Sequence, residues 1–193
     1  RILAPFLFSS MNFSRYDVVI VSQTGAYTPN LIKKGKAVQI CYTHTPPRYL
    51  YGYATARDWK KNPTLKLIGT LMNHILRLVD YKSSENVDYF ISNSENVRQR
   101  IQKFYRRDAK VVYPPVEIPD SSNEKKDNYF LAGGRIAGPK HIDLIIKAFK
   151  ELKIPLKIYG RTFAGTHSLE LMTQNSKIEL LGEVSDAAKQ ELL

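Results

Sequence analysis

A segment that combines two glycines with two cations has the residue types of an anion-binding loop. Gly133 and Gly134 follow an apolar run, and glycine lets a backbone approach a ligand closely. Arg135 and Lys140 come next, just before residues 141–152, whose apolar spacing predicts a helix. The free N–H groups and the dipole at a helix start favour an anion. The spacing is neither Gly-x-x-x-x-Gly-Lys-Ser/Thr nor Gly-x-Gly-x-x-Gly, so an anion site and an ordinary strand-to-helix turn both remain open.

Two further candidates follow predicted strands. His44 comes just after the apolar run 37–42, and Gly160 and Arg161 follow the strand residues 156–159. Ligands of parallel α/β sheets bind outside the carboxyl ends of the strands, so His44 could act there as a catalytic group and Gly160-Arg161 could contact a nucleotide. A lone histidine is more often structural. The remaining histidines lack metal-ligand spacing to each other or to Cys41, so we expect no metal site.

Three other segments allow both a functional and a structural interpretation. The aromatic residues between 48 and 59 could stack on a sugar, lie at a lipid interface or belong to the core. Ser92 with Glu95 three residues later fits a capping box, which accounts for Ser92 without a ligand. The basic residues between 98 and 110 form either a solvated face or a contact with an anionic partner. Neither a Gly-x-Ser-x-Gly elbow nor a paired-carboxylate pattern occurs.

Strands and helices alternate along the chain, which predicts an α/β fold with parallel sheets covered by helices. Short β-branched runs predict strands, and helically spaced apolar residues predict helices. The first residues, Ile2 to Ala4, look extended. The predicted strands are 17–22, 37–42, 87–91, 110–113, 129–132, 156–160 and 178–182, and the predicted helices begin at Pro63, after Ser92, at residue 141 and near Ser185.

A polar segment, residues 119–128, predicts a linker between a first domain, residues 1–118, and a second, residues 129–193. Residues 1–119 hold 18 Lys+Arg and 8 Asp+Glu, whereas residues 120–193 hold 11 and 10. Such a charge step favours two functional halves, and the basic half could face an anionic membrane surface, an anionic acceptor or nucleic acid.

Composition adds further bounds. The chain is 43% hydrophobic and 24% charged, which is typical of a globular protein. Its only cysteine, Cys41, rules out an internal disulfide and makes a reducing cytoplasm the simplest setting. No apolar run approaches the roughly 18 residues of a membrane span.

Six stretches occur in an order that resembles a known enzyme family. They are residues 16–20, 42–48 (Tyr-Thr-His-Thr-Pro-Pro-Arg), 89–94, 111–116, 132–140 and 181–186. Together they resemble the GT-B glycosyltransferases of family four, and the resemblance extends over nearly the whole chain. The His-Thr-Pro-Pro-Arg form is most similar to the mannosyltransferase-like branch used in bacterial surface polysaccharide synthesis.

The resemblance implies two Rossmann-like parallel-sheet half-domains of a GT-B fold, both truncated. It implies a retaining, metal-independent hexosyltransferase that moves a sugar, with mannose favoured, from a nucleotide sugar such as GDP-mannose or a UDP-sugar to a glycan or lipid-linked acceptor. No cofactor is expected beyond this donor. The family's first strand and glycine-rich loop would precede Arg1, and its pair of glutamates would follow Leu193. We therefore expect an internal fragment, inactive alone, from a protein in the cytoplasm or at the inner face of the membrane.

The resemblance also implies residue roles. Arg135 and Lys140 match the family's two cations that neutralise the donor diphosphate and stabilise the leaving group. Gly133 and Gly134 match the close backbone approach to the phosphates. His44 matches the histidine near the donor sugar and the acceptor.

Two alternatives come from other functional classes. The first is a basic α/β protein that binds nucleic acid, which only the net charge of +11 supports. Helix-turn-helix, zinc and RNA-recognition motifs are missing from the sequence, so we expect no nucleic-acid partner. The second is a nucleotide-binding module without catalytic activity.

Overall fold

The computed structural model describes residues 3–25, 27–53, 63–116, 127–162, 172–174 and 176–192. The chain divides into two compact units, residues 1–116 and 117–193. Each unit contains a parallel sheet with helices, so the predicted α/β class is confirmed. The linker predicted at 119–128 lies outside the described residues except for Asp127 and Asn128.

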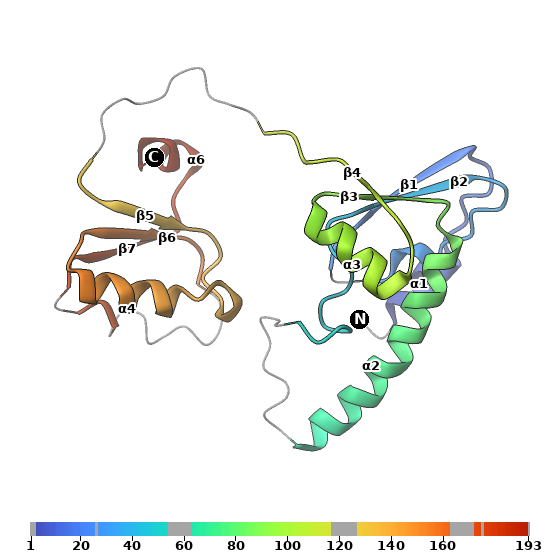
Figure 1. Ribbon diagram of the computed structural model, residues 1–193, viewed down its shortest axis with the longest axis horizontal. Coiled ribbons are helices and arrows are strands. Elements are labelled where there is room, and N and C mark those ends of the chain that lie inside the picture. Colours follow the sequence, from blue (N-terminus) through green and yellow to red (C-terminus); the bar gives the residue numbers. More distant parts are fainter. Residues whose placement is uncertain are drawn as a thin grey trace. The chain divides into compact units, whose positions relative to one another are not determined.

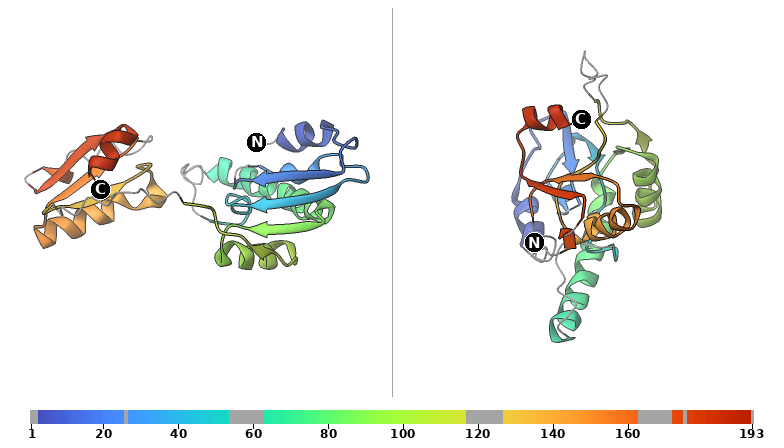
Figure 2. Two further views of the ribbon diagram at one scale, coloured as in Figure 1. Left: turned by 90° about the horizontal axis from the view of Figure 1, so that it is seen from above. Right: turned by 90° about the vertical axis from the view of Figure 1, so that its left-hand side faces the viewer.

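The first unit contains a parallel sheet of four strands in the order β1 (Val18–Gln23), β2 (Val38–Thr43), β3 (Tyr89–Ser92) and β4 (Lys110–Val111). Figure 2 shows these strands side by side. The first three lie within two residues of their predicted bounds. β4 is shorter than predicted, because the bond from Val112 N–H to Ser92 O (2.9 Å) is the last that joins this segment to β3.

The helical elements of this unit are α1 (Ala4–Ser10), η1 (Pro29–Leu31), α2 (Pro63–Ser83), η3 (Ser84–Asn86) and α3 (Glu95–Tyr105). The helices α1, α2 and α3 lie on the same side of the sheet (Figure 1). Val97, Ile101 and Tyr105 of α3 pack against the strand residues that point to this side. Apolar side chains on the opposite face, among them Val18 and Ile20, are exposed in the described part of the chain.

Two local predictions for this unit are wrong. The extended start proves to be α1, where Pro5 occupies the first turn, a position that tolerates a missing N–H. Ser92 does not cap α3: it is the last residue of β3, fully buried, and its Oγ has no hydrogen-bond partner among the described residues. Ser94 is the N-cap instead, and its Oγ accepts a hydrogen bond from Val97 N–H at 3.3 Å.

The second unit contains β5 (Phe130–Gly133), β6 (Leu156–Tyr159) and β7 (Ile178–Gly182) in that order, all parallel. Its helical elements are η4 (Gly138–Lys140), α4 (Ile142–Leu152) and α6 (Asp186–Leu192), and Figure 1 shows α4 and α6 on opposite sides of the sheet. The core is formed mainly by isoleucines of α4 and the strands. None of the described helices of either unit has the length and apolarity that a bilayer crossing requires.

Candidate functional site

Three loops meet at the carboxyl ends of the strands in the second unit. Gly134 N–H donates to Tyr159 O (3.2 Å), and Ile136 N–H donates to Arg161 O (2.9 Å). Gly160 N–H donates to Gly182 O (2.6 Å). The loops after β5, β6 and β7 are therefore joined through their backbones into one surface, which brings together Gly133, Gly134, Gly160 and Arg161.

The glycines of this surface have different reasons to be small. Gly134 has φ +124°, and a Cβ there would meet nothing within 4 Å, so its backbone faces open space. Gly160 has φ +138°, and its Cβ would lie 1.8 Å from the carbonyl oxygen of Gly134. Gly133 is the last residue of β5, where a Cβ would lie 2.0 Å from Cζ of Tyr159. Of these three glycines, only Gly134 offers the open backbone approach that an anion needs.

Arg135 follows Gly134 directly, Lys140 comes five residues after Arg135, and both side chains are exposed. Ile136 and Ala137, which follow Arg135, are buried and anchor the segment to the core. Lys140 closes the short helix η4 immediately before α4. The first turn of α4 contains Asp143, whose carboxylate already interacts favourably with the helix dipole. Attraction for an anion at this place therefore comes mainly from the two cationic side chains.

Arg161 has a partner that the sequence did not indicate. Its Nε lies 3.3 Å from Oε1 of Glu183, and both side chains are largely exposed. Exposed ion pairs contribute little stability, but Glu183 offsets the charge of Arg161. Arg161 is thus a weaker candidate for a phosphate contact than its charge alone suggests.

His44 lies at the carboxyl end of β2 in the first unit. Its backbone N–H donates to Gln23 O at 2.9 Å, which fixes the position of the residue beside the end of β1. Its Nε2 lies 3.1 Å from Ser22 Oγ, within hydrogen-bonding distance. The ring of Tyr42 meets the imidazole edge-on, with centroids 5.1 Å apart. The imidazole is half-buried and oriented by two neighbours, as a group used in catalysis requires.

Ser22 is a site residue that the sequence analysis missed. Ser22 pairs with Tyr42 in the register of β1 and β2, so their side chains lie on the same face as His44. Only the strand register, combined with the alternation of side chains along a strand, could have revealed this neighbour.

The loop after His44 is held by α3. Arg100 Nη1 donates to Thr45 Oγ1 at 3.1 Å, and its guanidinium carbon lies 4.5 Å from the ring centroid of Tyr53. Tyr51 stacks on Phe104, with centroids 4.1 Å apart. Tyr51 and Tyr53 therefore serve packing, and Trp59 lies outside the described residues.

A buried polar network lies beneath this loop. Asp80 Oδ2 accepts hydrogen bonds from the hydroxyls of Tyr51 (2.8 Å) and Tyr105 (2.9 Å), and Gln23 Nε2 donates to Tyr105 at 3.1 Å. Burial raises the pKa of Asp80 to about 6, although the two tyrosine hydrogen bonds act to lower it. Burial and the neighbouring carboxylate raise the pKa of both tyrosines. The network joins α2, α3, β1 and the loop of His44.

Cys41 has no features of a nucleophile. Its side chain is fully buried, and burial raises the pKa of the thiol to about 11. Reactive cysteines have a lowered pKa and solvent access. In the described part of the chain, no group of three or more His, Cys, Asp or Glu side chains is placed to hold a metal ion.

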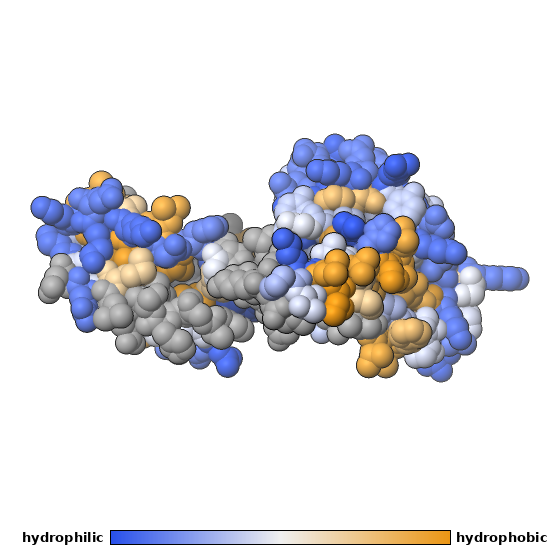
Figure 3. All heavy atoms as spheres, turned by 90° about the horizontal axis from the view of Figure 1, so that it is seen from below, coloured by the Kyte–Doolittle hydropathy of each residue, from blue (hydrophilic) through white to orange (hydrophobic). Residues whose placement is uncertain are grey.

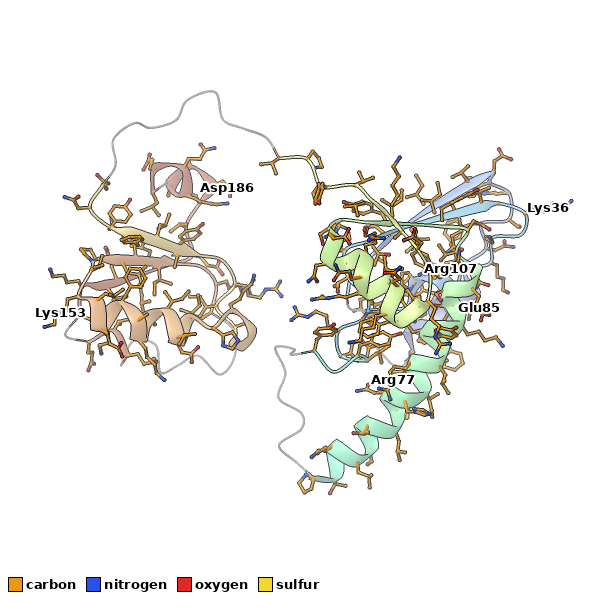
Figure 4. All side chains as sticks on the ribbon, in the orientation of Figure 1. Lys36, Arg77, Glu85, Arg107, Lys153 and Asp186 are labelled. Atoms are coloured by element: carbon orange, nitrogen blue, oxygen red, sulfur yellow. The ribbon has the colours of Figure 1, made fainter. Side chains whose placement is uncertain are left out.

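Four of the six basic residues between 98 and 110 have intramolecular partners that the structure identifies, among them Lys103, whose Nζ lies 5.7 Å from the ring centroid of Phe104. Arg98 pairs with Glu95 and Asp108. Arg107, labelled in Figure 4, donates to Val87 O at 2.8 Å and to Ser84 O at 3.3 Å. Together with Arg100, these contacts favour a structural interpretation of this basic run.

An apolar pocket of about 270 Å³ lies beside β1 in the first unit. Ser22, whose hydroxyl reaches His44, is among the residues that line it. Its apolar lining includes Phe8, Phe13, Val21, Tyr27 and Ile32. A second pocket of about 470 Å³ is bordered by Lys150, Lys153 and Lys177, at the amino ends of the strands in the second unit and away from Gly134.

Comparison with known proteins gives no match: no protein-family model and no curated protein sequence matches this chain. Its function must therefore be inferred from the two sets of residues at the carboxyl ends of its sheets.

Proposed function

We propose that the chain belongs to a retaining glycosyltransferase that transfers a sugar, with mannose favoured, from a nucleotide sugar to a glycan or lipid-linked acceptor. In this proposal the second unit binds the donor diphosphate without a metal ion, and His44 of the first unit acts near the donor sugar and the acceptor. The observation that carries the proposal is the loop after β5, where the exposed side chains of Arg135 and Lys140 follow the open backbone of Gly134 along the chain.

The chemistry follows from the leaving group. When the glycosidic bond to the donor breaks, the nucleoside diphosphate gains negative charge. Fixed cations beside it stabilise that charge more in the transition state than in the ground state. Arg135 and Lys140 supply two such cations on a segment that buried Ile136 and Ala137 hold in place.

Nucleotide binding gives the first test. Calorimetry with GDP and UDP should show binding to the chain that Arg135→Ala/Lys140→Ala weakens by roughly tenfold to a hundredfold, because a hydrogen bond to a charged group contributes about 1.5–3 kcal/mol. The control is Lys147→Ala/Lys189→Ala, which removes the same charge from exposed positions of α4 and α6. Equal losses in the two double variants would show that net charge, and not the loop, attracts the nucleotide.

Turnover separates transfer from simple binding. In the complete protein, with EDTA present, His44→Ala should lower release of nucleoside diphosphate from GDP-mannose or a UDP-sugar while leaving nucleotide affinity unchanged. Nucleotide binding without turnover of any donor would favour the non-catalytic module. Salt-sensitive DNA binding at micromolar concentration would favour the nucleic-acid alternative, although Arg98, Arg100 and Arg107 already have protein partners.

A further inference from the structure

Gln23 connects His44 to the buried polar network of the first unit. It is the last residue of β1 and is fully buried. Its backbone oxygen accepts the hydrogen bond from His44 N–H at 2.9 Å. The residue before it, Ser22, supplies the hydroxyl that lies 3.1 Å from His44 Nε2. Both the backbone and the imidazole of His44 therefore depend on the position of the end of β1.

Hydrogen bonds at both ends of its amide fix the side chain of Gln23. Nε2 donates to the hydroxyl of Tyr105 at 3.1 Å. Oε1 accepts a hydrogen bond from Thr43 Oγ1 at 3.2 Å, and Cys41 Sγ, a weak donor, lies 3.5 Å from the same oxygen. Thr43 pairs with Gln23 in the strand register and directly precedes His44. The side chain of Gln23 thus joins the end of β1 to the end of β2 and to α3.

Asp80 sets the direction of these hydrogen bonds. Above its raised pKa of about 6, its carboxylate only accepts hydrogen bonds. The hydroxyl of Tyr105 donates to Asp80 Oδ2 at 2.9 Å, which uses its single proton. The oxygen of Tyr105 is then left to accept from Gln23, so Nε2 must face Tyr105 and Oε1 must face Thr43. The reversed amide would place Oε1 against the oxygen of Tyr105, two acceptors with no proton between them.

These connected side chains lie away from water. Figure 3 shows apolar and hydrophilic side chains next to one another on one face of the first unit. Gln23, Thr43, Asp80 and Tyr105 contribute almost nothing to the surface, since each is at most 2% exposed. At buried positions water does not replace a lost hydrogen bond, so the loss of one partner leaves the next group unsatisfied. A change at Tyr105 should therefore reach the end of β1.

We propose that a buried positioning network orients the imidazole of His44. The network consists of Asp80, Tyr105 and Gln23. Its hydrogen bonds hold the end of β1 in place, and the end of β1 holds the histidine through one backbone bond and the hydroxyl of Ser22. The three residues act through His44, so they are positioning residues and not catalytic ones. The use of the oriented imidazole in sugar transfer rests on the proposed function, whereas its orientation does not.

Tyr51 supplies a matched control. Its hydroxyl donates to the same oxygen of Asp80, at 2.8 Å, but within the described ranges it has no hydrogen bond to Gln23. Its ring stacks on Phe104 with centroids 4.1 Å apart, a contact that Tyr51→Phe retains. Tyr51→Phe and Tyr105→Phe therefore each delete one phenolic oxygen bonded to Asp80. Only Tyr105→Phe separates Gln23 from the carboxylate.

Amide hydrogen exchange of the 193-residue chain, followed by NMR, measures how firmly the histidine is held. In Tyr105→Phe the amide of His44 should exchange roughly threefold to tenfold faster than in the parent, because its acceptor is less firmly held. The rate is taken relative to the amide of Ile101 in α3, which is fully buried and reports opening of the whole unit. In Tyr51→Phe this relative rate should stay within about twofold of the parent.

The imidazole gives an independent readout. In proton–carbon NMR spectra the ring signals of His44 should move in Tyr105→Phe and in Gln23→Met, which removes both polar ends of the amide at similar size. The ring signals of His141, which lies in the second unit, should stay in place and serve as an internal reference. Tyr105→Phe loses a single oxygen, so it tests the proposal even if Gln23→Met fails to fold.

Turnover by the complete protein separates this inference from the proposed function. Tyr105→Phe should lower kcat for the nucleotide sugar by roughly threefold or more with KM unchanged, because a misplaced catalytic group slows the chemical step and not donor binding. If the parent turns over no nucleotide sugar, the proposed function fails, and exchange at His44 still decides whether the network positions it. Equal exchange at His44 in Tyr105→Phe and Tyr51→Phe would overturn the proposal. A kcat equal to that of an active parent in Tyr105→Phe would also overturn it.

Discussion

Replacing Asp80 by asparagine should change how the stability of the first unit depends on pH. Asp80 is 1% exposed and accepts hydrogen bonds from Tyr51 and Tyr105 through Oδ2, while its Oδ1 has no partner in the described part of the chain. Burial penalises the charged carboxylate and raises its pKa from 3.8 to about 6. Asparagine keeps an oxygen that can accept both tyrosine bonds but carries no charge at any pH.

The sign and size follow from proton linkage. Between pH 3.8 and about 6, the folded protein holds a proton on Asp80 that the unfolded chain has lost. The free energy of unfolding therefore falls as pH rises through this window, and the fall is complete above it. A difference of about two pKa units corresponds to about 3 kcal/mol. The parent chain should lose up to that amount relative to Asp80→Asn between pH 4 and pH 7.

Cys41 provides an assay specific to the first unit. It is the only cysteine of the chain and is fully buried, so a short pulse of methyl methanethiosulfonate labels it only when this unit opens. Urea titrations from pH 4 to pH 8, read by mass spectrometry of the labelled thiol, give the free energy of unfolding for both proteins. Their difference isolates Asp80 from other titrating groups.

Asp88 supplies a control of opposite sign. The hydrogen bond from Lys34, and then the one from the backbone N–H of Gln39, lower the pKa of Asp88. The stability that Asp88 contributes should be lost as pH falls. The difference in the free energy of unfolding between the parent and Asp88→Asn should therefore become smaller at low pH. If the difference in the free energy of unfolding between the parent and Asp80→Asn stays constant across the titration, the inference that the folded protein buries Asp80 with a raised pKa is refuted.

The remaining predictions concern backbone and capping. Gly160→Ala should destabilise the second unit by more than 2 kcal/mol, because its Cβ would lie 1.8 Å from Gly134 O at φ +138°, whereas Gly138→Ala, with nothing within 4 Å, should change thermal stability little. Ser94→Ala should cost about 1 kcal/mol in urea unfolding through loss of the α3 cap. Ser92→Ala should be neutral or slightly stabilising because its buried Oγ has no partner among the described residues; an equal cost for both serines would refute this assignment of the cap.

Local sequence patterns predicted the strands and long helices well, since burial fixes their periodicity. The β-branched run 17–22 became β1 and the helically spaced run after Pro63 became α2, although Ile20 of β1 and Leu71 of α2 are exposed. α1 was missed because seven residues give too few turns for a period to be visible. The cap of α3 was misplaced by two residues because two serines stand near its start, and only backbone geometry decides between them.

The candidate site was less accessible to sequence reasoning, because its partners are distant along the chain. Ser22 meets His44 across two strands, and Glu183 meets Arg161 across two loops. Asp80 meets Tyr51 only after α2 has folded against the loop that precedes it. Such pairs depend on strand register and helix rotation, which local propensity does not determine. Arg135 and Lys140 were identifiable because their positions follow from a strand, a turn and a helix in direct succession.

The backbone bonds among Gly134, Tyr159, Ile136, Arg161, Gly160 and Gly182 have an entropic consequence. Ordering one residue costs roughly 1–2 kcal/mol of conformational free energy. In the second unit this free energy is spent during folding and not during ligand binding, because backbone hydrogen bonds to the ends of the neighbouring strands already order the loop after β5. A ligand that binds above Gly134 would meet an ordered backbone and would lose little affinity to loop ordering.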